Sequence, residues 1–162
     1  MCIDELRFEA AKNRVIGINR ERQGIGTLSE KTVHAVLKNY YAPDTDMHEI
    51  PIENFVADIF TGTEIIEIQT RSFQVMRRKL DAFLKIYPVT IVYPIPHVKW
   101  LSWIDEESGE MSPKRKSPKK GNPYVAFKEL YKIRPFLKNE NLRFRFALID
   151  ICLLYTSPSP RD

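Results

Sequence analysis

The chain has 162 residues, and its 25 lysines and arginines outnumber its 21 aspartates and glutamates, which gives a formal net charge of +4 at pH 7. No apolar run approaches the roughly 20 residues of a membrane-spanning helix, and the N-terminus lacks the apolar region of a signal peptide, so we expect a cytoplasmic protein without a membrane partner. The modest positive charge permits a nucleic-acid partner without requiring one.

Both ends of the chain differ from its middle. Residues 1–26 are polar and mixed in charge, and we expect an N-terminal arm or extension there. Residues 152–162, CLLYTSPSPRD, resemble a translated sequencing-library adapter, which indicates a non-native tail and a missing natural C-terminal part. Cys2 is then the one native cysteine, which excludes an intrachain disulfide. Residues 27–151 suit a single domain.

The first helix is predicted from about Leu28 to Tyr41. Thr27 to Glu30 form a capping-box pattern, and apolar residues follow at spacings of three and four. Glu30 extends the apolar stripe, so its carboxylate either only closes the capping box or also points into a site beyond the sheet. His34 lies near the edge of the stripe, where we expect a packing or surface residue rather than a ligand.

Three strands are predicted next. Met47 to Glu53 form a short strand, and Pro51 favours an edge or irregular position for it. Phe55–Phe60 and Glu64–Gln69 then form a hairpin around Gly62-Thr63, with glycine first, as a type II′ turn requires.

The hairpin register brings two acids together. A two-residue turn pairs Thr61 with Glu64 and therefore Asp58 with Glu67; a four-residue loop gives the same register, whereas a three-residue loop does not. Side chains alternate along a strand, so Glu67 and Gln69 share a face. Opposed carboxylates repel unless a cation or a proton lies between them, so the register is a first indication of a metal site.

A helix and a covered strand follow the hairpin. Ser72 can cap a helix whose apolar face is formed by Phe73, Met76, Leu80, Phe83 and Leu84. Val89–Tyr93 is a continuous apolar and β-branched run, typical of a strand covered on both faces, and the crossover places it parallel to Glu64–Thr70. We expect Pro94 and Pro96 to end this core.

The remaining segments are predicted from local signals. Val98–Asp105 reads as another strand, followed by a turn at Ser108-Gly109 and a basic segment. Asn122 and Pro123 are typical of a helix start, which predicts a helix from Tyr124 to about Ile133. Arg143–Ile151 begins a strand that the adapter-like tail interrupts.

The order αβββαβ, with Glu30 on the first helix, Asp58 on the second strand and Glu67-Ile68-Gln69 on the third, resembles the PD-(D/E)xK nuclease superfamily over residues 27–95. The helix starting Gly-Thr-Leu-Ser-Glu-Lys, Gly26 to Lys31, is similar to that of a bacterial subgroup of that superfamily. The resemblance implies an α/β restriction-endonuclease-like fold with a mixed sheet flanked by helices, C-terminally truncated in this chain.

The resemblance also implies a Mg²⁺-dependent phosphodiesterase acting on nucleic acid, DNA rather than RNA. Asp58, Glu67 and the backbone carbonyl of Ile68 would supply oxygen ligands to Mg²⁺, and Glu30 would hold a metal-bound water or a second ion. Gln69 stands where the superfamily usually has lysine; glutamine can hydrogen-bond the attacking water but carries no charge. The expected substitute cations are Arg71 first, then Arg77 and Arg78.

Other readings of the same residues stay open. The basic segment would contact phosphates, or it is a solvated loop; its cations are Lys114, Arg115, Lys116, Lys119 and Lys120. The alternative is a non-catalytic nucleic-acid-binding module on the same fold. A third reading is a structural or interaction domain in which Asp58 and Glu67 are merely solvent-facing residues. The oligomeric state does not follow from the sequence.

Overall fold

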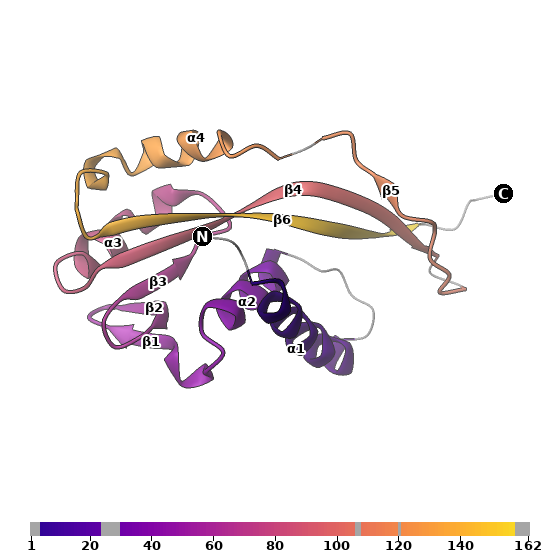
Figure 1. Ribbon diagram of the computed structural model, residues 1–162, viewed down its shortest axis with the longest axis horizontal. Coiled ribbons are helices and arrows are strands. Elements are labelled where there is room, and N and C mark those ends of the chain that lie inside the picture. Colours follow the sequence, from indigo (N-terminus) through magenta and orange to yellow (C-terminus); the bar gives the residue numbers. More distant parts are fainter. Residues whose placement is uncertain (1–3, 24–29, 106–107, 120, 158–162) are drawn as a thin grey trace.

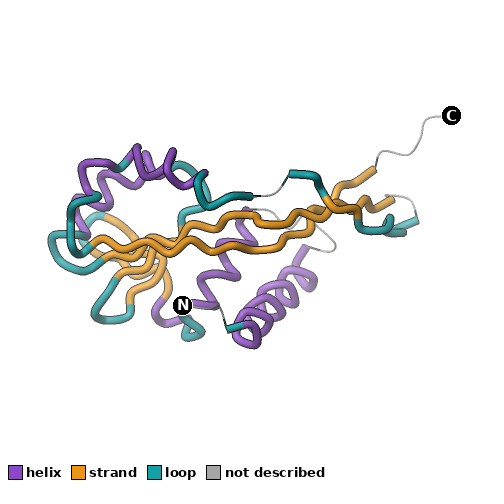
Figure 2. Tube along the Cα trace, turned by 45° about the horizontal axis from the view of Figure 1, so that its top comes forward, coloured by secondary structure: helices purple, strands orange, loops and turns teal. Residues whose placement is uncertain are grey.

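The protein is described by a computed structural model that covers residues 4–23, 30–105, 108–119 and 121–157. Within these residues a mixed six-stranded sheet carries helices on both faces, as Figures 1 and 2 show. The predicted α/β fold with a mixed sheet flanked by helices is therefore confirmed. The strands are β1 (His48–Ile52), β2 (Phe55–Phe60), β3 (Ile65–Ile68), β4 (Val89–Asp105), β5 (Arg115–Lys116) and β6 (Leu142–Ser157).

The strands join a meander to a parallel unit. β1, β2 and β3 pair antiparallel in chain order, and β4 lies parallel to β3, as the crossover predicted. β6 lies parallel to β4 along almost its whole length, whereas β5 pairs antiparallel with β4 near its far end. The far ends of β4 and β6 extend past the helices toward β5 (Figure 1).

Two layers of helices cover the sheet. α1 and α2 lie on one face, and α3 and α4 lie on the other (Figure 1). The helices are α1 (Glu5–Gln23), α2 (Glu30–Tyr41), α3 (Arg77–Phe83) and α4 (Val125–Lys132), with short 3₁₀ turns η1 (Thr45–Met47), η2 (Phe73–Met76) and η3 (Arg134–Phe136). None of the helices in the described part of the chain has the length and hydropathy that a bilayer-spanning segment needs.

Each layer has its own apolar core. On the α2 face, Leu37 packs with Ile59, Ile66 and Val92. On the α3 face, the predicted helix stripe is buried and packs against Ile65 and Ile91; the stripe residues are Phe73, Met76, Leu80, Phe83 and Leu84. Because β3 and the first part of β4 are covered on both sides, they are apolar in nearly every position, and Glu67 is an exception.

The N-terminal segment, expected as an arm or extension, forms helix α1 over Glu5–Gln23. α1 packs against α2 through Ala11 and Val15, which are buried with Val36 and Tyr40. These two small residues, four apart, are the buried residues of α1 in its described part. Phe8 is partly buried against the same cluster whereas Leu6 is exposed, so the apolar residues of α1 are not confined to one face.

Pro94 and Pro96 do not end the core strand, contrary to expectation. β3 pairs with β4 only as far as Val92, while β6 continues to pair opposite Pro94 and Pro96. The amide of Gln69 donates to the carbonyl of Val92, and the amide of Val89 donates to the carbonyl of Asn141. The backbone N–H and C=O groups of even-numbered β4 residues therefore point toward β3, and those of odd-numbered residues point toward β6. Both prolines therefore lack an N–H on the side where β3 has ended, and the ladder to β6 is kept.

The adapter-like segment takes part in β6 as far as the structure describes it. Residues 152–157 continue the strand beyond Ile151 and pair with β4 between Trp100 and Asp105. Residues 158–162 lie outside the described part of the chain.

Candidate functional site

The predicted hairpin register is confirmed. β2 and β3 pair Ile59 with Ile66 and Phe60 with Ile65. The amide of Thr61 donates to the carbonyl of Glu64 at 3.1 Å, and Gly62 has a φ of 90°. This register places Asp58 opposite Glu67, just past the pair Ile59–Ile66 that ends the ladder.

Beyond that pair, the side-chain carboxylates of Asp58 and Glu67 accept the backbone N–H groups of the opposite strand. The amide of Asp58 donates to Oε1 of Glu67 at 3.1 Å, and the amide of Ile68 donates to Oδ2 of Asp58 at 2.8 Å. Each strand thus gives a backbone N–H to the acid of the other strand. The exchange holds both carboxylates between β2 and β3 at the end of the hairpin ladder.

Glu67 is buried and paired with a lysine from the crossover helix. Its side chain is 5% exposed, and Nζ of Lys79 lies 2.6 Å from its Oε2. The Lys79 ammonium also lies 5.5 Å from the centroid of the Phe83 ring. Burial, and then the charge of Asp58, raise the pKa of Glu67 to about 7, although Lys79 and the amide of Asp58 act to lower it.

Asp58 is paired with a histidine from α2. Nε2 of His34 lies 3.2 Å from Oδ2 of Asp58, so the structure gives His34 a role that the sequence did not predict. Burial acts to raise the pKa of Asp58, but the hydrogen bond and charge of His34, the amide of Ile68 and the charge of Lys79 outweigh it and lower the pKa. Asp58 and Glu67 are therefore tuned in opposite directions.

A third acid lies on the other side of Asp58. β1 and β2 pair His48 with Ile59 and Ile50 with Ala57, so Glu49 falls opposite Asp58 in the register. Glu49 has a φ of 53°, a strained conformation for a residue other than glycine. Its carboxylate accepts a 2.8 Å hydrogen bond from Lys38. That hydrogen bond, and then the charge of Lys38, lower the pKa of Glu49.

Glu49, Asp58 and Glu67 thus form a row across β1, β2 and β3, and each acid has a basic partner. Two of the partners, Lys38 and His34, are one turn apart on α2, and the third comes from α3 on the opposite face of the sheet. The row is a concentrated group of paired charges in a sheet that is otherwise mostly apolar.

The remaining predicted catalytic residues are placed as follows. Gln69 follows β3 directly, and its side-chain oxygen accepts from the amide of Arg71 at 3.1 Å. This hydrogen bond stabilises the turn that follows the strand. The backbone of Glu30 begins α2, but its side chain lies outside the described part of the structure.

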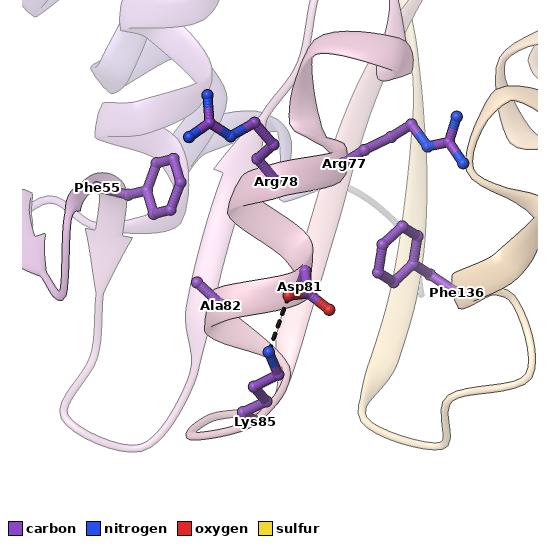
Figure 3. Close-up of a pocket in the computed structure, with 7 residues that line it drawn as sticks. All are labelled: Phe55, Arg77, Arg78, Asp81, Ala82, Lys85 and Phe136. Carbon is purple, nitrogen blue, oxygen red and sulfur yellow. Dashed lines mark hydrogen bonds and ion pairs between the residues drawn. The ribbon is translucent and has the colours of Figure 1, made fainter.

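Arg77 and Arg78 lie on α3 but extend to different sides of it, as Figure 3 shows. Both line a shallow pocket of about 450 Å³ that Phe55 and Phe136 flank. Lys85 is held by an ion pair with Asp81 at 2.8 Å. Neither arginine has a recorded contact with Glu67 in the described residues, and Lys79, two residues along from Arg77, makes that contact.

The basic segment lies far from Asp58 and Glu67. Arg115 and Lys116 form β5 and pair with Leu101 and Trp100, and Lys114 and Lys119 are exposed. Glu67 pairs with Ile91, nine residues before Trp100, so about 30 Å of strand separates the two places. Lys120 lies outside the described residues.

Sequence reasoning missed Lys79, although a signal was present. Lys79 follows Met76 by three residues and precedes Phe83 by four, so it falls on the apolar face of the helix. A lysine on such a face needs an acid partner in the core that the face covers. Glu67 is the buried acid of that core.

Two of the acids could hold a metal ion together. Asp58 and Glu67 are hard oxygen donors with an unfavourable mutual charge, which fits Mg²⁺, an ion that binds one or two carboxylates and keeps several waters. Among the described residues, no three His, Cys, Asp or Glu side chains gather as a complete metal-binding group.

Folding stability is expected to fall as the pH rises from 5 to 8. The pKa of Glu67 is raised from 4.5 to about 7. The contribution of Glu67 to the free energy of unfolding is therefore present in full below pH 4.5 and is lost as the pH rises through 7. The shift corresponds to about 3 kcal/mol at most. Urea unfolding of the wild type and Glu67→Gln should show this pH dependence in the wild type only.

Glu53→Gln, at the exposed turn between β1 and β2, is the matched control and should keep the wild-type dependence. An equal pH dependence in wild type and Glu67→Gln would contradict the assignment of the shift to Glu67.

Comparison with known proteins gives the chain a family. A family model described as a domain of unknown function (DUF8091) matches residues 31–155. An uncharacterised protein of Treponema pallidum (strain Nichols) is 28% identical over 127 residues, which are 77% of this chain and 50% of that protein. The chain thus spans about half the length of this relative. No solved structure matches the chain. Because the family model covers well over half of the chain, the protein belongs to the DUF8091 family.

Proposed function

We propose that this chain is a Mg²⁺-dependent nuclease of the PD-(D/E)xK type that hydrolyses phosphodiester bonds of DNA in the cytoplasm. The observation that carries the proposal is the opposed pair Asp58 and Glu67 at the end of the β2–β3 ladder, with Lys79 bound to Glu67 at 2.6 Å. The order of α2, the three-strand meander, α3 and β4 supports it, because it is the αβββαβ order of that superfamily.

In this proposal Asp58, Glu67 and the carbonyl of Ile68 hold the ion. Bound Mg²⁺ would lower the pKa of a water and neutralise charge on the scissile phosphate. Glu67 must be ionised to serve as a ligand, and its pKa of about 7 makes metal binding release a proton near neutral pH. Asp58, whose pKa is lowered, is ionised throughout that range.

Lys79 takes the part of the lysine that is absent at position 69. The superfamily uses that lysine as a point charge beside the phosphate and the attacking water. Here the ammonium reaches Glu67 from α3, and its stem runs past Phe83 on the buried side of the helix. A substitute cation was expected, but we predicted it from Arg71, then Arg77 or Arg78, rather than from Lys79.

His34 holds the carboxylate of Asp58 in place. Oδ2 of Asp58 accepts from the amide of Ile68 and lies 3.2 Å from Nε2 of His34, so this oxygen is fixed from the sheet and from α2. Partners of this kind orient a metal-binding carboxylate and leave its second oxygen for the ion. We assign His34 as a positioning residue.

Asp58→Asn should reduce Mg²⁺-dependent cleavage of plasmid and single-stranded DNA by at least about 100-fold, because the loss of a partner outside the ligand set alone costs 10–100-fold. Asp46→Asn, an exposed acid in η1, is the matched control and should cleave normally. A gel assay of the purified chain measures both.

Other outcomes of that assay separate the alternatives. Cleavage that survives Asp58→Asn would assign the activity to another site or a contaminant. Salt-dependent binding of DNA without cleavage would favour a non-catalytic binding module on the same fold. The absence of both binding and cleavage would favour a structural or interaction domain.

Lys79→Met should lower cleavage while leaving Mg²⁺ binding at least as tight as in the wild type. The ammonium competes with the ion for Glu67, so its removal frees a carboxylate oxygen but takes away the charge beside the phosphate. Titration calorimetry with Mg²⁺, read beside the cleavage rate, checks this prediction. Lys85→Met, in the exposed turn just after the same helix, is the control. Weaker Mg²⁺ binding in Lys79→Met would contradict it.

The affinity for Mg²⁺ should rise about tenfold from pH 6 to pH 8, because a group with a pKa near 7 passes from mostly protonated to mostly ionised over that range. Calorimetry of the wild type at both pH values measures the change. A flat response, or one that Glu67→Gln retains, would remove Glu67 from the ligand set.

A further inference from the structure

We propose that the outer face of α4, together with Arg77 and Arg134, binds single-stranded nucleic acid and leads it to the Asp58–Glu67 site. We name this surface the α4 track; its residues are Tyr124, Phe127, Lys128, Tyr131, Arg77 and Arg134. The inference deepens the proposed function, because it assigns the form of substrate that the same site receives.

Aromatic rings dominate the outer face of α4. Tyr124, Phe127 and Tyr131 are 72%, 63% and 72% exposed, and their spacing of three and four places them in one stripe. The rings of Tyr124 and Phe127 lie nearly parallel, with an interplanar angle of 12° and centroids 6.0 Å apart. The opposite side of the helix faces the core through Ala126. The aromatic stripe therefore does not contribute to packing α4 against the core.

The outer face carries positive charge without an exposed acid. Glu129, the acid of α4, is turned inward: its Oε2 accepts from the amide of Phe73 at 2.9 Å and its Oε1 from Lys132 at 2.6 Å. Lys128 remains exposed beside the aromatic stripe. An anionic ligand would therefore meet rings and a cation on this face without an opposing carboxylate.

A pocket joins the stripe to two arginines. It has a volume of about 540 Å³ and lies where α4 meets η2, α3 and η3; it is lined by Gln74, Arg77, Tyr131, Lys132, Arg134 and Pro135. The guanidinium groups of Arg77 and Arg134 form no recorded ion pair or hydrogen bond with other described residues. Figure 3 shows that Arg77 extends away from α3 and from Arg78. One exposed ring and two available cations thus border the same hollow.

The α4 track begins close to the proposed site. Glu129 accepts from the amide of Phe73, and Lys132 donates to Oγ of Ser72 at 2.9 Å, so α4 is fastened to the segment that follows β3. Ser72 lies four residues after Ile68, a span of at most about 14 Å even for an extended chain. A strand bound along α4 would arrive at the end of β3 where Asp58 and Glu67 lie.

Single-stranded nucleic acid matches these features better than the other ligand classes. Its base faces can stack on exposed rings, whereas a duplex hides them. Its phosphates would pair with Arg77 and Arg134, which an apolar protein segment would leave unpaired. The combination of stacking rings and a basic groove is typical of binding without sequence preference.

The test measures fluorescence anisotropy of a labelled 20-nucleotide oligothymidylate with the full chain in EDTA, where no cleavage occurs. Phe127→Leu and Tyr131→Leu should each weaken binding at least about fivefold, the lower limit for one stacked base. Arg77→Gln with Arg134→Gln should reduce the salt slope by about 1.4, the value for two phosphate contacts on a single strand. A labelled hairpin duplex should bind more weakly than the oligothymidylate.

The controls are Val125→Ala, on the flank of α4, and Lys12→Gln, on α1 across the sheet; neither should change the affinity more than twofold. Unchanged binding by the two leucine variants, or equal binding of the duplex, would overturn the proposal. The proposal would also be overturned if light scattering shows a dimer that Phe127→Leu dissociates and the oligothymidylate does not bind.

Binding and cleavage fail separately in this design. Asp58→Asn should bind the oligothymidylate like the wild type. Binding through the α4 track without any Mg²⁺-dependent cleavage would support the track and refute the nuclease. If the leucine variants keep both wild-type cleavage and wild-type binding, the nuclease would be supported and the track refuted.

Discussion

The opposition of Asp58 and Glu67 is the constraint on which the arrangement of the sheet and helices depends. Two carboxylates between neighbouring strands repel each other, and the structure meets that repulsion from both faces of the sheet, with His34 on α2 and Lys79 on α3. The backbone contributes as well, because each acid accepts an amide N–H from the other strand. Both helix layers are therefore tied to one point of the hairpin by charge as well as by apolar packing.

The two acids differ in how readily they keep their charge. Asp58 keeps its charge because His34 and Ile68 hold the ionised form, whereas burial leaves Glu67 close to its titration point at neutral pH. A site built only of strongly ionised acids would repel itself in the absence of a cation. In this arrangement the proton on Glu67 and the ammonium of Lys79 relieve that repulsion, and in the proposed site both would give way to an arriving cation.

Local chemistry predicted much of the fold, and non-local packing decided the rest. The register of Asp58 and Glu67 followed from the two-residue turn at Gly62, because turn length alone determines which residues face each other. The passage of β4 through Pro94 could not be predicted, since it depends on where β3 ends in space. Lys79 was missed for a different reason: its place on the apolar face of the helix could be seen in the sequence, but the nearby Arg77 and Arg78 carry the same charge and were preferred.

The separation of Glu67 and Lys79 along the chain affects how such proteins can be detected and how they can change. The pair is 12 residues apart in sequence but in direct contact in space, so a pattern that requires the lysine two positions after the acid passes over this chain. In the proposed nuclease, position 69 is therefore released from carrying charge, and Gln69 shapes the turn toward Arg71. Substitution should then be tolerated more readily at position 69 than at position 79, which reverses the expectation from the strand motif alone.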